Sequence, residues 1–298
     1  MSIEIIYNVK SSRAKSDPMS MLHRLFSGFT TEFKVSLTTG TDMCELIARA
    51  KIANPDIIVI AGGDGSISTA AGELVDSEIR LGILPIGRFN HFARHAGIPL
   101  EMEQAVQAIF EGRIQEIDVG KVNGKVFINN SSIGFYPRAV WLREQISITW
   151  GGRKGMVMIM ALLTMFKRFP VLRIEVEAGG EMIRRKTSFV FIGNNKYEMH
   201  LLDIGQRKSL QKGRLSLYTG NFNTRSSILR LIFFLLCNRL KQDRDFEYHM
   251  VRKVKLHTQR KSIQVSTDGE IQKMKTPLHY TIHPRGLMVM TPKQSEVG

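Results

Sequence analysis

Apolar and polar positions in the first ~120 residues alternate between two spacings. Short runs of consecutive apolar residues, typical of strands buried on both faces, are each followed by a segment whose apolar residues recur every three or four positions. Asp42, with Glu45 three residues later, predicts a capping box at the start of one such segment. The pattern predicts a doubly wound α/β domain, a parallel sheet with helices on both faces. The expected strands are 3–8, 34–39, 55–63 and 79–87, and the main expected helices are 43–53, 66–75 and 102–112.

Strand-like stretches in the second half come in pairs around turn residues. Asn123-Gly124, between two of them, is a strong hairpin signal. Helical patterns near 137–166 and 225–241 interrupt the strands, so we expect an antiparallel β-sandwich with helical insertions. The expected pairs are 116–122 with 125–131, 171–177 with 182–193, 252–258 with 261–267, and 271–274 with 278–282. The expected domains are 1–120 and 121–286, with a last strand within 287–298 that returns to the first domain.

Composition adds a strong positive charge to this picture. The 298 residues carry a formal net charge of +15, which favours an anionic partner such as a membrane surface, a nucleic acid or a phosphorylated ligand. We find no helix-turn-helix pattern and no aromatic-bearing RNA motif, so a nucleic acid is not expected. The N-terminus has no signal-peptide pattern and the chain has only two cysteines, which favours a cytoplasmic, reducing location.

Two apolar runs, 155–166 and 228–237, are flanked by basic residues. Each is shorter than the roughly 20 residues that a membrane-spanning helix needs. Two interpretations are open: both runs are core helices, or one of them is a helix that lies in a membrane interface beside anionic headgroups. Together with the net charge, they predict reversible association with an anionic membrane surface.

A glycine turn, Gly62-Gly63-Asp64-Gly65-Ser66, follows the most apolar expected strand. In a doubly wound sheet, ligands bind beyond the carboxyl ends of the strands. The glycines let backbone N–H groups approach a ligand, and the helix start that follows favours phosphate. An acid in a turn that only binds phosphate would repel it, whereas an acid that holds a metal ion or orients a hydroxyl suits phosphoryl transfer. The turn matches neither the dinucleotide fingerprint nor a Walker loop.

Five motifs in order along the chain resemble those of the diacylglycerol kinase-type lipid kinases, in their soluble bacterial branch. That superfamily also contains sphingosine kinases and is related in plan to the NAD kinases. The motifs are "YNVKSS" at 7–12, "GGDGS" at 62–66, "LPIGRFNHFARHAGIP" at 84–99, "IDVGKVNGKVFINNSSIGFYPRAV" at 117–140 and "DGE" at 268–270.

The resemblance implies an enzyme that transfers the γ-phosphate of ATP to a hydroxyl of diacylglycerol or a similar lipid in phospholipid biosynthesis. It implies ATP with Mg²⁺, an ATP site between the two domains, Glu270 as general base helped by Asp268, and Asp64 as a catalytic residue and the metal anchor. It is compatible with a peripheral membrane protein and with a homodimer. The residues that would bind the nucleotide are Asn8, Ser11, Ser12, Thr38, Gly62, Gly63, Asp64, Gly65, Ser66, Gly87, Arg88 and Asn90.

Departures from the family pattern keep alternatives open. Arg88 replaces a usual threonine and either binds phosphate or fills the pocket. His91 stands where many relatives have an acid. Lys212 stands where many have the aspartate of a structural Mg²⁺ turn, so we expect that second metal to be absent. The alternatives are an NAD kinase-like enzyme and a catalytically impaired relative that binds nucleotide or anionic lipid.

Overall fold

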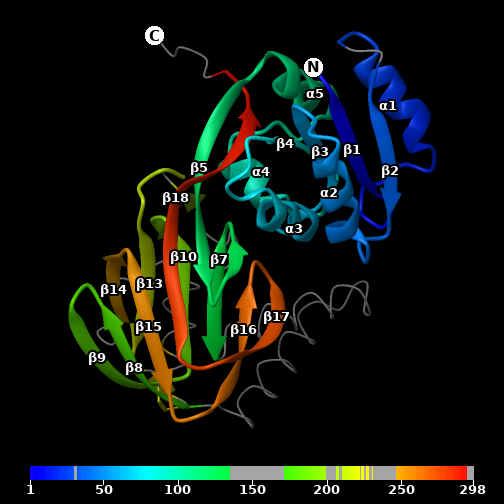
Figure 1. Ribbon diagram of the computed structural model, residues 1–298. Coiled ribbons are helices and arrows are strands. Elements are labelled where there is room, and N and C mark those ends of the chain that lie inside the picture. The colour runs from blue at the N-terminus through cyan, green and yellow to red at the C-terminus, as the bar shows by residue number, and fades with distance from the viewer. Residues whose placement is uncertain are drawn as a thin grey trace. The chain divides into compact units, whose positions relative to one another are not determined.

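The computed structural model describes residues 1–29, 32–134, 171–198, 206–207, 210–221, 223–224, 226–227, 230 and 246–293 (Figure 1). The helical insertions expected near 137–166 and 225–241, and with them both apolar runs, fall outside these residues, apart from 226–227 and 230. The chain divides into two compact units, Met1–Val119 with His283–Gly298, and Gly120–Ile282. No helix among the described residues is long and apolar enough to cross a membrane.

The first unit contains the predicted parallel sheet. Its order is β2-β1-β3-β4, and the C-terminal part of β18 runs parallel to β4 through the pairing of Val289 with Leu81. All six residues of β3 are buried, as the unbroken apolar run requires. The strand bounds are β1 Ile3–Asn8, β2 Lys34–Thr38, β3 Ile57–Gly62, β4 Arg80–Pro85 and β18 Leu278–Thr291.

Helices cover this sheet in two groups, since α1 packs with α5 and α2 packs with α3 (Figure 1). The doubly wound α/β prediction is therefore confirmed. The predicted capping box is wrong: α2 begins at Met43, but the Asp42 side chain makes no cap hydrogen bond, because it accepts one from the Thr38 hydroxyl. The helix bounds are α1 Pro18–Phe26, α2 Met43–Ile52, α3 Asp64–Leu74, α4 His91–His95 and α5 Met102–Glu111.

The second unit is an antiparallel β-sandwich. One sheet has the order β14-β13-β10-β7-β16-β17, and the other contains β15, β8, β9 and the N-terminal part of β18. One buried apolar cluster joins both sheets, with Ile133 and Val265 from the first and Val176 and Leu256 from the second. The sandwich prediction is confirmed. The strand bounds are β5 Arg113–Val122, β6 Lys125–Phe127, β7 Asn130–Gly134, β8 Leu172–Ala178, β9 Glu181–Thr187, β10 Phe189–Asn194, β11 Tyr197–Glu198, β12 Gln206–Arg207, β13 Leu215–Gly220, β14 Phe246–Val251, β15 Lys253–Thr258, β16 Ser262–Thr267 and β17 Glu270–Lys275.

The hairpin predictions are confirmed in part. β5 pairs with β6 around Asn123-Gly124, whose positive φ angles of 45° and 87° suit the tight turn. β8 pairs with β9, but the stretch expected as one strand over 182–193 is two strands, because β10 leaves β9 and joins the other sheet. β15 and β16 do not pair with each other, since they belong to different sheets, and neither do β17 and β18. The short connections after β9, β15 and β17 therefore each lead to the other sheet of the sandwich.

Candidate functional site

The strand order of the first unit places a switch point between β1 and β3. β1 leads to β2 on one side, whereas β3 leads to β4 on the other. The loops that follow β1 and β3 therefore diverge, and doubly wound sheets bind ligands at this point, beyond the carboxyl ends of the strands. The glycine turn 62–65 lies there, at the end of β3 and the start of α3.

The glycines of the turn have different local requirements. A Cβ atom added at Gly87 would lie 2.4 Å from the Cα atom of Gly63, so position 87 must be glycine for the loops after β3 and β4 to meet. A Cβ atom added at Gly63 would lie 3.2 Å from the Cα atom of Gly87, a tight but milder contact. A Cβ atom added at Gly62 would lie 2.5 Å from that of Ser66. Gly65, by contrast, has no atom within 4 Å of an added Cβ. The protein itself therefore does not require glycine at position 65.

The start of α3 is open to an anion. Gly63 is its N-cap residue and no side chain caps the helix. The first backbone N–H groups of a helix have no partner within the helix, and the helix dipole favours negative charge beside them. This arrangement suits a phosphate group.

Asn90 contributes a buried acceptor next to the glycines. Its side chain is only 1% exposed, and its backbone has a left-handed φ of 53°, which asparagine tolerates better than most residues. The amide nitrogen donates to the carbonyl oxygens of Pro85 and Gly87, each at 3.0 Å. The Oδ1 atom has no partner among the described residues. Since an unpaired buried acceptor costs about 1–3 kcal/mol, a donor on a bound ligand would stabilise it.

The loops after β1 and β2 contribute polar side chains to the same edge. Asn8 donates from Nδ2 to the Ser66 hydroxyl at 3.0 Å and accepts from the Lys10 N–H at 3.0 Å. The buried Thr38 hydroxyl donates to Asp42 and accepts from the Gly40 N–H at 2.8 Å. Polar side chains thus lie at the ends of β1 and β2 and at the start of α3, and the Val9 N–H donates to the Thr38 carbonyl at 2.9 Å.

Ser11 and Ser12 lie in the turn that follows Asn8. Within the described residues, neither hydroxyl makes a hydrogen bond, although the Ser11 N–H donates to the Asn8 carbonyl at 3.1 Å. The Arg13 N–H donates to the Ile86 carbonyl at 2.9 Å, which fixes this turn beside the residue that precedes Gly87. Their hydroxyls remain candidates for a nucleotide contact.

Asp64 has a structural contact as well as its predicted role. Its Oδ1 atom accepts from the Phe92 N–H at 3.0 Å, which connects the glycine turn to the start of α4. Within the described parts of the chain, no three His, Cys, Asp or Glu side chains gather as a metal site would require. These residues fit an Mg²⁺ ion that is held mainly by phosphates and water with one carboxylate, as is usual for nucleotide-bound Mg²⁺.

Arg88 is exposed, and its side chain lies over the ring of Phe89 in the loop after β4. Its guanidinium lies 5.4 Å from the centre of the Phe89 ring, and that ring stacks on His91 with centroids 5.4 Å apart and planes 8° apart. In this structure the Arg88 side chain lies at the surface and does not fill the interior of the site.

The second unit brings Asp268 and Glu270 together at the β16–β17 hairpin. Asp268 and Gly269 form its turn, with positive φ angles of 50° and 94°. The Asp268 carboxylate accepts from three successive backbone N–H groups, two between β6 and β7 and one at the first residue of β7. These are Ile128 at 2.8 Å, Asn129 at 2.8 Å and Asn130 at 3.0 Å. Both oxygens of Asp268 are thus engaged in holding the backbone.

Glu270 is in a different environment. It is the first residue of β17, its side chain is 55% exposed, and its carboxylate lies 3.7 Å from the Lys125 ammonium. Sequence reasoning missed Lys125, because its link to Glu270 depends on the hairpin β5–β6 meeting β17. Lys212 is exposed, and its backbone N–H donates to the Asn195 amide oxygen at 2.9 Å.

The expected site residues therefore form two groups. The first unit gathers the residues expected to bind nucleotide, and the second unit gathers Asp268 and Glu270. Sequence reasoning missed Asp42 and the Phe92 N–H in the first group. Asp42 carried a signal, since an aspartate four residues after Thr38 can accept its hydroxyl, but the capping-box pattern suggested another role for it.

Comparison with known proteins agrees with this geometry. Residues 2–122 match the family model of the diacylglycerol kinase catalytic domain. The diacylglycerol kinase of Bacillus subtilis (strain 168) is 26% identical over 301 residues, which is 97% of this chain and 96% of that protein. The diacylglycerol kinase of Staphylococcus saprophyticus is 31% identical over 135 residues, 44% of each chain.

The fold is also that of a solved relative. The crystal structure of a diacylglycerol kinase from Bacillus anthracis str. Sterne superimposes with a TM-score of 0.73 at 19% identity, covering 97% of this chain and 96% of that one. At this identity the likeness shows a shared fold, an α/β unit followed by a sandwich. Residues 2–122 of the chain thus resemble the catalytic domain of diacylglycerol kinases, and at lower identity the resemblance to one such enzyme extends over nearly the whole chain.

Proposed function

We propose that the chain transfers the γ-phosphate of ATP to a hydroxyl group of diacylglycerol or a similar lipid. The observation that carries the nucleotide half is the uncapped start of α3 beside Gly65, whose surroundings are open, and beside the unpartnered oxygen of the buried Asn90. The lipid half rests on the similar proteins, which are diacylglycerol kinases. One of them matches nearly the whole chain, and another matches part of it.

The glycine turn binds and orients the nucleotide in this proposal. Backbone N–H groups at the start of α3 donate to phosphate oxygens, and Asn8 holds Ser66 in place beside them. Asp64 would hold Mg²⁺, which when bound neutralises charge that develops on the transferred phosphate. The contact of Asp64 with the Phe92 N–H keeps its carboxylate in one orientation.

Glu270 is the general base in this proposal, and Asp268 is a positioning residue. Glu270 takes the proton of the lipid hydroxyl, the hydroxyl oxygen forms a bond to the γ-phosphorus, and the bond from that phosphorus to the bridging oxygen breaks, which releases ADP. The Glu270 carboxylate is exposed and lies 3.7 Å from the Lys125 ammonium, so it is accessible for this step. Asp268 is less suited, because both its oxygens already accept backbone N–H groups.

A lipid substrate requires contact with a membrane. The net charge of +15 supports peripheral association with an anionic surface, of the kind that falls as salt rises. Binding to vesicles with and without anionic lipid, at low and high salt, tests this part separately from catalysis.

The test of the proposed function is transfer of label from γ-labelled ATP to a panel of acceptors. The panel contains diacylglycerol, a sphingoid base and a prenol in mixed micelles, and NAD in solution. Label in a lipid supports the proposal and identifies the acceptor. Label in NAD alone would assign an NAD kinase-like activity instead, and label in none, from folded protein that binds ATP, would indicate an impaired relative.

A further inference from the structure

A second polar surface lies in the sandwich, and none of the residues assigned to the kinase site lines it. A hollow of about 600 Å³ is bordered by strands β8, β9 and β15. Asn221, Asn223 and His257 are among the residues that line it. Its charged lining residues are four permanent cations and one carboxylate, namely Arg173, Arg184, Arg185, Lys186 and Glu175.

Two of these cations face each other without a counter-charge. Arg173 on β8 is directly opposite Lys186 on β9 in the antiparallel register, so their side chains share one face of the sheet. Both are exposed, and neither forms an ion pair with any of the described residues. Like charges placed directly opposite each other destabilise a strand pair, so an anion bound between them would remove this repulsion.

The neighbouring pair shows what a compensated arrangement looks like. Glu175 is two residues along β8 from Arg173, on the same face, and is directly opposite Arg184. The Arg184 Nε atom lies 3.1 Å from the Glu175 carboxylate. On this face, Arg184 therefore has a carboxylate directly opposite it, whereas Arg173 and Lys186 are opposite each other.

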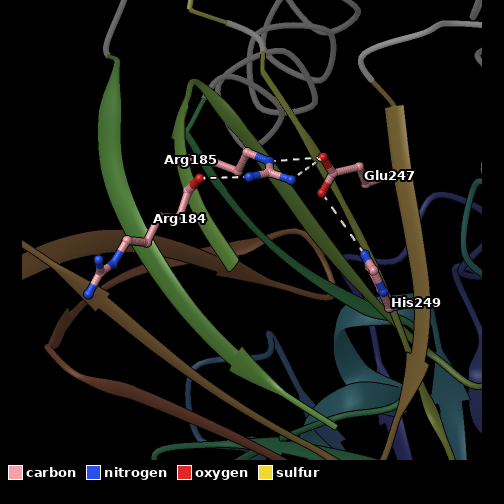
Figure 2. A network of polar contacts seen from close by, with 4 residues as sticks. All are labelled: Arg184, Arg185, Glu247 and His249. Carbon is pink, nitrogen blue, oxygen red and sulfur yellow. Dashed lines mark hydrogen bonds and ion pairs between the residues drawn. The ribbon is translucent and has the colours of Figure 1, made fainter. Parts of the chain in front are cut away.

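Arg185 belongs to a separate network and is not available to a ligand in the same way. It donates from Nε at 2.8 Å and from Nη2 at 2.5 Å to Glu247, and from Nη1 to the Arg184 carbonyl at 2.8 Å. Glu247 also lies 4.0 Å from the His249 ring. Figure 2 shows the Arg184 and Arg185 side chains leaving β9 in opposite directions, so Arg185 lies on the face opposite to that of Arg184 and Lys186.

The chemistry of the uncompensated pair matches a phosphate group. A guanidinium offers paired donors in a plane that suits two phosphate oxygens, and an ammonium adds a mobile point charge. Because β9 is the last strand of its sheet in this unit, a ligand can approach the pair from the side. We propose that Arg173 and Lys186 form an anion site for a phosphate group, carried by a soluble phosphate ester or by a phospholipid headgroup.

The test compares two variants of equal charge. Arg173→Ala/Lys186→Ala removes the site, and Lys273→Ala/Lys275→Ala removes two exposed lysines from β17 in the other sheet. One arm measures binding of glycerol 3-phosphate by calorimetry, and the other measures sedimentation with phosphatidylglycerol vesicles, against phosphatidylcholine vesicles. Neither arm uses ATP or turnover, so the result does not depend on the proposed kinase activity.

The expected result is that the wild type binds in at least one arm, and that Arg173→Ala/Lys186→Ala weakens this binding by about tenfold or more, the effect of losing charge-assisted bonds. The lysine control should stay within about twofold. Binding in the soluble arm identifies a phosphate ester, and binding only to phosphatidylglycerol vesicles identifies a headgroup. If both double variants lost binding equally, the effect would be one of overall charge and the proposed site would be wrong. The site would also be wrong if the wild type bound in neither arm. If the Arg173→Ala/Lys186→Ala variant does not fold, the single variant Lys186→Gln replaces it, and it should weaken binding in the same arm.

Discussion

The substitution Gly65→Ala tests whether the glycine at this position is needed for the fold or for binding the nucleotide. Gly65 is the second residue of α3, its φ angle is not in the left-handed region, and nothing lies within 4 Å of an added Cβ atom. Alanine is the better helix former, and Gly→Ala changes at compatible sites stabilise proteins by about 0.4–1 kcal/mol. The free energy of unfolding should therefore stay the same or rise by that amount.

Nucleotide binding should respond in the opposite direction. If phosphate oxygens lie against the backbone at the start of α3, the added methyl group occupies part of their space. We expect the Kd for ATP to rise by about tenfold or more, which corresponds to about 1.4 kcal/mol of lost binding free energy. Thermal unfolding gives the stability and calorimetric titration with ATP and Mg²⁺ gives the Kd.

Gly87→Ala is the matched control for this experiment. Its methyl group would lie 2.4 Å from the Gly63 Cα and 2.6 Å from the Asn90 Oδ1 atom, so the loops must shift. Overpacking of this kind costs about 1–3 kcal/mol, so this variant should lose stability where Gly65→Ala does not. Wild-type affinity for ATP in a folded Gly65→Ala protein would refute the idea that the nucleotide lies against this turn.

Three further substitutions test individual roles. Glu270→Gln should fold normally and lower kcat by about 10² or more, because an amide cannot take a proton; undiminished kcat would remove Glu270 as the base. Asp268→Ala should lower the midpoint of thermal unfolding, because three backbone N–H groups lose the carboxylate that accepts from them. A loss of activity at unchanged stability would instead indicate that Asp268 takes part in the chemistry directly. Arg88→Thr should weaken ATP binding by about 10- to 100-fold in calorimetry if the exposed guanidinium binds phosphate, and tighter binding would mean that the arginine obstructs the site.

Local sequence patterns predicted the elements of the first unit well. The apolar run of β3 and the glycines that follow it required a buried strand and a tight turn, and the structure has both. The role of Asp42 could not be predicted in the same way. Its spacing to Glu45 satisfied a local capping rule, but the Thr38 hydroxyl at the end of the neighbouring strand provides a partner that the local rule does not include.

Long-range contacts explain the other differences. Asp268 lies 140 positions from Ile128 in the sequence, so no local spacing reveals that its carboxylate holds that backbone. The turns after β9 and after β15 resemble hairpin turns, yet each passes from one sheet of the sandwich to the other. The unpartnered oxygen of Asn90 is likewise visible only once the fold has buried the residue and used its amide nitrogen elsewhere.

Transfer of label from γ-labelled ATP to diacylglycerol by the wild type and by Asp64→Asn tests the central claim most directly. Asparagine keeps an oxygen that can accept the Phe92 N–H, so the variant should fold and unfold like the wild type. The account predicts labelled lipid from the wild type and a rate lower by about 10² or more from Asp64→Asn. Equal rates from the two folded proteins, or a wild type that labels no lipid, would contradict it.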